Sequence, residues 1–161
     1  MAIQAGQKLP SARFKCVTAE GVKDMTTEEL FGGKKVVLFA LPGAFTPTCS
    51  AKHLPGYVEQ ADAILAKGAD RIVCLSVNDS FVMGAWARDR GVDLKKIIML
   101  ADGNAELTRA LGLELDGSGF GMGLRAQRFA MIVEDGVVTK LNVEKPMKFE
   151  VSDAATILAA L

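Results

Sequence analysis

The feature that most constrains the fold is a series of short apolar runs separated by helical patterns. The runs are rich in β-branched residues and bounded by turn residues, which is typical of buried strands. They are KKVVLFAL at 34–41, RIVCLSV at 71–77 and KIIML at 96–100. Helical patterns cover about residues 48–67, 80–90 and 105–111. Strands that alternate with helices pair in parallel, so these segments predict an α/β fold with helices on both faces of the sheet.

The end of the chain predicts antiparallel strands and one more helix. The segment 128–144 is typical of a hairpin with Asp135-Gly136 at its turn, and Ser152 is a suitable N-cap for a last helix. We expect the long helix at 48–67 to bend at Pro55-Gly56. The 161 residues contain no repeat and no linker, so we expect one domain, residues 1–161, with a mixed central sheet.

Charge and composition narrow the functional classes. The chain has 19 Lys plus Arg and 19 Asp plus Glu, which gives it no electrostatic preference for nucleic acid or an anionic membrane. No apolar run is long enough to span a bilayer. The first ten residues, MAIQAGQKLP, carry no targeting pattern, which predicts a cytoplasmic location; a mature organellar protein that has lost its transit peptide would look the same.

Three cysteines, Cys16, Cys49 and Cys74, are too few for a disulfide scaffold, and one histidine does not make a zinc site. Cys49 lies at a strong helix start, in which Thr46 suits the N-cap and Pro47 the first helical position. Cys49 therefore stands where a capping box carries a carboxylate. A thiolate there could accept from backbone N–H groups and the Thr46 hydroxyl, at the positive end of the helix dipole.

A helix start alone does not ionise a thiol at neutral pH. An ordinary cysteine is about 3% thiolate at pH 7, and a helix N-terminus raises this to roughly a quarter. A cation within about 4–6 Å would stabilise the thiolate much further. The site is therefore expected to need an arginine or lysine from another part of the fold.

The segment PGAFTPTC, residues 42–49, resembles the Pro-x-x-x-Thr-x-x-Cys signature of peroxiredoxins. With KHLPGY after it, the segment is similar to the peroxiredoxin-5 and plant type II branch, and the likeness continues through SVNDSFVMGAWA, ADGNAELTRALGLELD and RAQRFAMIVEDGVV. It covers nearly the whole chain. The resemblance implies a thioredoxin-like fold and reduction of hydrogen peroxide and alkyl hydroperoxides without a metal or bound cofactor.

The resemblance also implies roles for individual residues. Cys49 matches the peroxidatic cysteine, and Thr46 the residue whose hydroxyl bonds the sulfur and the peroxide. Pro42 matches the residue that shields the thiolate from water, and Arg128 the arginine that completes the pocket. Only the family match selects Arg128 over Arg125. The family further implies a homodimer.

The same resemblance bears on how Cys49 is recycled. Some plant relatives have a cysteine at the spacing of Cys74 that is proposed to resolve the sulfenic acid, but a mid-strand residue cannot approach Cys49 without local unfolding, which favours a core role. The C-terminal resolving cysteine of animal-type members has no counterpart in VEKPMKFEVSD. We therefore expect a one-cysteine cycle with glutathione and glutaredoxin, or thioredoxin, as reductant, and a structural Cys16.

Two alternatives remain open from the residues alone. His53 lies four residues after Cys49, a spacing that a hydrolase with a cysteine nucleophile and a histidine base could use, although packing beside the site is favoured. A non-catalytic redox sensor or chaperone would oxidise Cys49 without turnover. The glycine-rich segment 117–123 does not match a phosphate-binding loop, and we expect it to border the site or a subunit contact.

Overall fold

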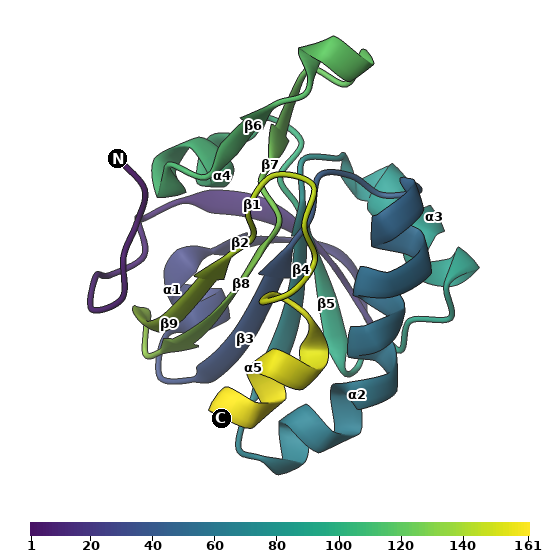
Figure 1. The fold of residues 1–161 in the computed structure, drawn as a ribbon. Coiled ribbons are helices and arrows are strands. Elements are labelled where there is room, and N and C mark those ends of the chain that lie inside the picture. Colours follow the sequence, from purple (N-terminus) through teal and green to yellow (C-terminus); the bar gives the residue numbers. More distant parts are fainter.

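The computed structural model describes residues 1–161, and its centre is a seven-stranded mixed sheet (Figure 1). The strands of this sheet are β1 Arg13–Thr18, β2 Gly21–Thr26, β3 Lys35–Ala40, β4 Arg71–Ser76, β5 Ile97–Ala101, β8 Phe129–Glu134 and β9 Val137–Val143. Their order is β2-β1-β5-β4-β3-β8-β9, in which β3, β4 and β5 are parallel and the other pairs antiparallel. The short strands β6 Glu114–Asp116 and β7 Leu124–Ala126 pair separately. The predicted mixed α/β sheet is confirmed, including the hairpin turn at Asp135-Gly136.

Helices cover both faces of the sheet (Figure 1). They are α1 Thr27–Phe31, α2 Leu54–Ala66, α3 Ser80–Asp89, α4 Glu106–Leu111 and α5 Ala154–Ala160, with a π-helical turn η1 at Cys49–His53 and a 3₁₀ turn η2 at Ser118–Phe120. One apolar cluster lies under α2, α3 and α5, and a second lies on the opposite face under α1 and α4. None of these helices is both long and apolar enough to cross a lipid bilayer.

The carboxyl ends of the parallel strands meet at one edge of the sheet. The segment 41–48 leaves β3 there, and it is tied to the end of β4 through Asn78. The Asn78 side-chain oxygen accepts from the Ala44 amide at 3.0 Å and from the Ser76 hydroxyl at 2.6 Å. Two neighbouring strand ends therefore fix the segment that leads to Cys49.

Two details differ from the sequence predictions. The irregularity of the long helix is the wide turn η1, in which the Leu54 amide donates to the Cys49 carbonyl, rather than a bend at Pro55-Gly56. Pro55 has no N–H to continue an α-helical ladder, and the wide turn accommodates it just before α2 continues regularly. The N-cap of α5 is Asp153, which accepts from the Thr156 amide, because the Ser152 hydroxyl instead donates to Glu144.

Candidate active site

Cys49 is the first residue of η1, and only 1% of its surface is exposed. The helical turn begins as predicted, because Pro47 and Thr48 are helical and the Ser50 amide donates to the Thr46 carbonyl at 2.9 Å. The Cys49 sulfur is thus at the amino end of a helix that continues to Ala66. At this degree of burial the sulfur is out of reach of a large molecule.

Arg128 supplies the cation that the sequence argument required. It immediately precedes β8, and the antiparallel pairing of Phe129 with Ala40 brings it next to the segment that follows β3. Its Nη2 donates to the Cys49 sulfur at 3.1 Å, and its Nη1 lies 2.7 Å from His53 Nδ1. A guanidinium held at this distance stabilises a thiolate directly.

His53 is fully buried and is held at both ring nitrogens. Nδ1 faces Arg128, and Nε2 lies 3.1 Å from the Ser152 carbonyl oxygen. Because a guanidinium has no acceptor and a carbonyl no donor, the proton is assigned to Nε2 and the lone pair to Nδ1. Burial, followed by the positive charge of Arg128, lowers the pKa of His53 from 6.5 to about 3. His53 is therefore a neutral acceptor for Arg128, and neither nitrogen is free to act as a base for Cys49.

The buried neutral His53 predicts a specific loss of stability in acid. Its pKa is lower in the folded chain than the ordinary 6.5, so below pH 6.5 the unfolded chain binds a proton that the folded chain does not. The free energy of unfolding should fall by up to about 1.4 kcal/mol per pH unit below 6.5, and should not depend on this group above it. Denaturant unfolding measured between pH 8 and about pH 5 checks this.

The matched variant for this measurement is His53→Gln, which keeps an amide acceptor and donor but does not titrate. Around His53, the pKa of Tyr57 is raised by burial and that of Glu144 lies below its ordinary value, so neither changes charge in this range. In the variant, the free energy of unfolding should fall less steeply with decreasing pH below 6.5. A pH dependence equal to that of the wild type would contradict a neutral His53 in the folded chain.

Thr46 and Pro42 border the same end of η1, but they contact other groups than expected. The Thr46 hydroxyl donates to the Gly43 carbonyl at 2.6 Å, and no hydrogen bond joins it to the Cys49 sulfur. The turn uses its proton, while its oxygen lone pairs remain able to accept. The Pro42 carbonyl accepts from Arg125 Nη1 at 3.4 Å.

Arg125 therefore also lies beside the site, although it does not contact the sulfur. A Cβ atom at Gly43 would come within 2.8 Å of Arg125 Nη1, so the close approach of this arginine requires a residue without a side chain. Arg125 also donates to the Met122 carbonyl in the glycine-rich segment. It packs that segment against the Pro42-Gly43 turn, whereas Arg128 alone reaches Cys49.

The other two cysteines differ from Cys49 in their surroundings. Cys74 is fully buried in mid-strand, paired with Phe39 on β3 and Met99 on β5, and burial raises its pKa well above the ordinary value, with a smaller contribution from Cys49. Cys16 lies in the cluster on the opposite face, where burial, partly offset by Arg71, raises its pKa to about 12. All three are free thiols. No group of three or more His, Cys, Asp or Glu side chains is placed to hold a metal ion.

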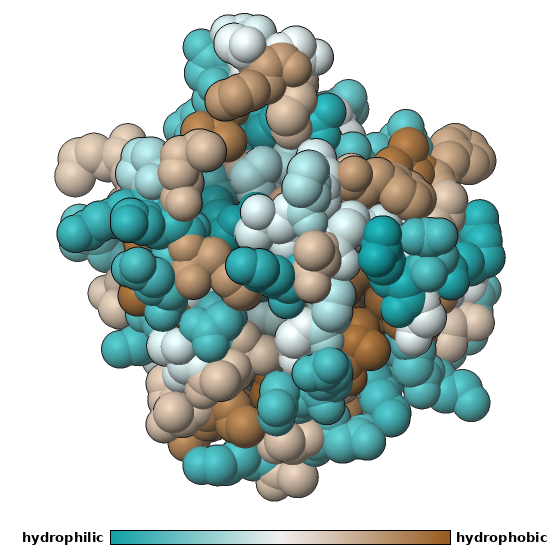
Figure 2. Space-filling view, turned by 45° about the vertical axis from the view of Figure 1, so that its right-hand side comes forward, coloured by the Kyte–Doolittle hydropathy of each residue, from teal (hydrophilic) through white to brown (hydrophobic).

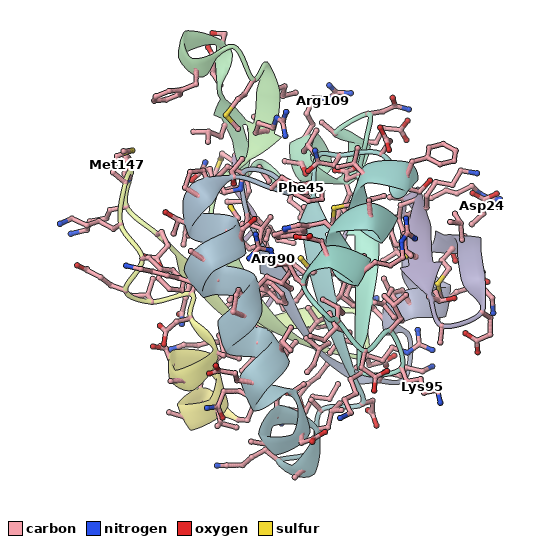
Figure 3. The ribbon with its side chains drawn as sticks, turned by 90° about the vertical axis from the view of Figure 1, so that its right-hand side faces the viewer. Asp24, Phe45, Arg90, Lys95, Arg109 and Met147 are labelled. Atoms are coloured by element: carbon pink, nitrogen blue, oxygen red, sulfur yellow. The ribbon has the colours of Figure 1, made fainter.

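The sequence did not predict the residues that lie behind His53. Tyr57, Glu144, Phe149 and Ser152 come from α2 and from the loop between β9 and α5, which rises to the same end of the sheet as the turn before α2 (Figure 1). Figure 3 shows Met147 at the outer tip of this loop, and Phe45 near the upper end of α2. In the sequence, the only signal was an acidic residue at the end of the predicted hairpin 128–144.

The Redoxin family model matches residues 4–158 of this chain. The rice protein Peroxiredoxin-2E-2, chloroplastic, is 50% identical over 163 residues, which cover 99% of this chain and 72% of the rice protein. The chain belongs to the peroxiredoxin family. The match with this plant protein, together with the site motif, places the peroxiredoxin in the plant type II and peroxiredoxin-5 branch, as predicted.

Solved structures agree with this family. Reduced Prx3 from Vibrio vulnificus in complex with H₂O₂ superposes with a TM-score of 0.92 at 59% identity, covering 98% of each chain. The Plasmodium falciparum antioxidant protein, a 1-Cys peroxiredoxin, superposes with a TM-score of 0.89 at 32% identity, covering 96% of each chain. The predicted thioredoxin-like fold is confirmed. The peroxiredoxin is a thiol peroxidase, which uses a peroxide as substrate and a thiol as reductant.

Proposed function

We propose that Cys49 is the peroxidatic cysteine and that Arg128 activates it. The observation that carries this proposal is the 3.1 Å contact between Arg128 Nη2 and the Cys49 sulfur at the start of a helix. Burial makes the contact effective, because the attraction between two charges increases as water is excluded. The other two cysteines lie in apolar surroundings without such a contact.

The proposed reaction is an in-line displacement. The Cys49 thiolate attacks one peroxide oxygen, an S–O bond forms and the O–O bond breaks. Cys49 becomes a sulfenic acid, and the departing oxygen leaves as water or an alcohol after taking up a proton. Negative charge moves from sulfur to the departing oxygen, so donors fixed beside the sulfur stabilise the transition state most.

Thr46 and Pro42 are proposed to shape the peroxide site. Since the Thr46 hydroxyl donates to the Gly43 carbonyl, its oxygen is available to accept from the peroxide O–H. Pro42 is half-buried, and its ring is proposed to keep water from the thiolate. Hydrogen peroxide and small alkyl hydroperoxides are the proposed substrates, supported by the H₂O₂ complex of the Vibrio vulnificus relative and by the near-complete burial of Cys49.

A one-cysteine cycle is the proposed route of recycling. Cys74 is held between two strands and cannot reach Cys49 without breaking the sheet, so we propose that an external thiol attacks the sulfenic acid. That attack forms a mixed disulfide and releases water, and a second thiol then restores Cys49. Glutathione with glutaredoxin, or thioredoxin, is the proposed reductant. Support comes from the 1-Cys relative of Plasmodium falciparum.

Intact-mass analysis after one equivalent of peroxide tests the cycle. We expect a dimedone adduct on Cys49 when dimedone is present, and no loss of two hydrogens from the chain. Peroxide consumption with the glutathione–glutaredoxin and thioredoxin systems, measured side by side, identifies the reductant. A stable disulfide between Cys49 and Cys74 would contradict the one-cysteine cycle.

The hydrolase alternative gains no support, since both nitrogens of His53 have other partners. Turnover with a reductant separates an enzyme from a sensor. We also propose that residues 1–161 form one domain, supported by one sheet that backs both apolar clusters. We propose a cytoplasmic location; the chloroplastic relative allows an organellar form as well.

We further propose a homodimer, which light scattering would test. Exposed apolar side chains are available for such a contact, namely Phe45, Phe81, Phe120 and Met147. Figure 2 shows apolar patches, coloured brown and tan, between the hydrophilic residues of this face.

A further inference from the structure

Glu144 is a buried carboxylate without a cationic partner. Only 8% of the residue is exposed, and it takes part in none of the three ion pairs of the structure. Its oxygens accept instead from the backbone amides of Glu150, Val151 and Ser152 at 2.8–2.9 Å and from the Ser152 hydroxyl at 2.7 Å. Burial by itself raises the pKa of Glu144, but these hydrogen bonds together bring it below the ordinary value. The residue is therefore an anion at neutral pH.

The anion folds the loop between β9 and α5 around itself. Three consecutive amides and the Ser152 hydroxyl point toward Glu144, so the position of Ser152, whose carbonyl faces the opposite partners, is fixed at both its amide and its side chain. That carbonyl lies 2.7 Å from the Tyr57 hydroxyl and 3.1 Å from His53 Nε2. Both lone pairs of the oxygen are used, one by each donor.

The direction of this carbonyl fixes the proton of His53. With the proton on Nε2, the lone pair of Nδ1 faces Arg128 Nη1 at 2.7 Å. The same guanidinium then presents Nη2 to Cys49. A neutral acceptor orients Arg128 without neutralising its charge, whereas a carboxylate in this place would compete with the thiolate for it.

The loop supports the arginine from a second side. The Phe149 ring lies 5.8 Å from the guanidinium carbon of Arg128 and 4.9 Å from the His53 ring. The backbone contributes as well, because the Glu144 amide donates to the Arg128 carbonyl at 2.9 Å. The loop between β9 and α5 therefore holds Arg128 in three ways: through the backbone of Glu144, through the Phe149 ring and through His53.

We propose that Glu144 is a positioning residue for the reaction at Cys49, acting through the Ser152 carbonyl and His53 on the orientation of Arg128. The inference rests on the proposed role of Arg128 and Cys49. It assigns a function to a residue about 16 positions from Arg128 in the sequence that touches neither the sulfur nor the substrate site. The hydrogen-bonded path is continuous from the carboxylate to the sulfur.

The test compares Glu144→Gln with Glu150→Gln. Glu150 lies in the same loop and its exposed side chain makes no contact in this network, so its variant removes the same charge without the same bonds. We expect Glu144→Gln to lower the rate constant of Cys49 with H₂O₂ about 10-fold or more. Half-maximal alkylation of Cys49 by iodoacetamide should also move to more alkaline pH. Glu150→Gln should match the wild type in both measurements.

A purely structural effect of Glu144→Gln is separated by changes at His53. His53→Leu removes the acceptor of Arg128 and should be slow, while His53→Gln keeps one and should restore most of the rate. In the His53→Leu background, Glu144→Gln should cause a smaller loss of rate than in the wild type, because the path through His53 is already broken and only the Phe149 contact of the loop with Arg128 remains. A double variant whose loss of rate equals the product of the losses of the two single variants would overturn the proposal.

Folding is monitored by thermal unfolding. If Glu144→Gln does not fold, Ser152→Ala tests the same path, because it removes one donor to Glu144 and keeps the carbonyl; a loss of roughly 2-fold to 3-fold is expected, and none would overturn the proposal. With an active wild type, equal rates for Glu144→Gln and Glu150→Gln would also overturn it. A wild type that does not consume peroxide would instead contradict the proposed function.

Discussion

Cys49→Ser is expected to lower peroxidase turnover by at least about 1,000-fold, to the background of the assay. A serine hydroxyl is not ionised at neutral pH, even beside a guanidinium, and its oxygen is a far weaker nucleophile toward a peroxide oxygen than a thiolate sulfur. The fold should persist, because the smaller oxygen can still accept from Arg128 Nη2. Peroxide consumption in the presence of glutathione and glutaredoxin measures the effect, and circular dichroism verifies the fold.

The controls for this variant are Cys74→Ala and Cys16→Ala. Both remove a buried thiol, so each should lower the free energy of unfolding by about 1 kcal/mol. Both should keep most of the peroxidase activity, because neither side chain contacts Arg128. Normal turnover of Cys49→Ser would contradict the proposed mechanism, and loss of turnover in Cys74→Ala would contradict the one-cysteine cycle.

Arg128→Ala should lower the rate of Cys49 oxidation by about 100-fold or more. The variant removes a donor fixed at the reacting sulfur, and one such donor in a buried site typically supplies a factor of this size. It also leaves His53 Nδ1 without a partner. Single-turnover oxidation followed by Trp86 fluorescence measures the rate, since the Trp86 indole donates to Ser50, the neighbour of Cys49.

Two matched variants sharpen the Arg128 experiment. Arg128→Lys keeps the charge, but one ammonium group cannot reproduce the fork that reaches the sulfur and His53 together, so it should recover only part of the rate. Arg125→Ala removes the neighbouring arginine, which contacts the Pro42 carbonyl and not the sulfur. A larger loss for Arg125→Ala than for Arg128→Ala would show that the wrong arginine has been assigned.

The strands and the helix start at Cys49 were predictable because their signals are local. The buried parallel strands β3, β4 and β5 are continuous apolar runs, and the hairpin turn at Asp135-Gly136 has the residues that a left-handed backbone requires at both positions. The helix start before Cys49 follows from Thr46-Pro47 alone. Each of these signals occupies fewer than about ten residues, so no knowledge of distant contacts was needed.

The partners of Cys49 depend on long-range pairing. The register of β8 on β3 decides whether Arg125 or Arg128 reaches the sulfur, and no local pattern encodes that register. The structure makes the choice that the resemblance favoured and the residues alone could not make.

Competition between neighbouring groups explains the remaining differences. Ser152 and Asp153 are both good N-caps, and the buried Glu144 decides between them by binding the Ser152 hydroxyl. The Thr46 hydroxyl has a closer acceptor in Gly43 than in the sulfur. Glu144 itself follows a strand and precedes the exposed stretch 145–148, so nothing in the sequence marked it as buried.

The wide turn η1 controls access to the sulfur of Cys49. In the proposed cycle, Cys49 must be reached first by a small peroxide and then by a larger thiol reductant, and only 1% of its surface is exposed. The proposal therefore requires Cys49–His53 to open before the oxidised sulfur is reduced. Until it unwinds, a second peroxide molecule can convert the sulfenic acid to the inactive sulfinic acid. In the proposed cycle, the free energy of opening this turn, which the hydrogen bond from Trp86 to Ser50 raises, therefore sets the peroxide concentration at which the enzyme is inactivated.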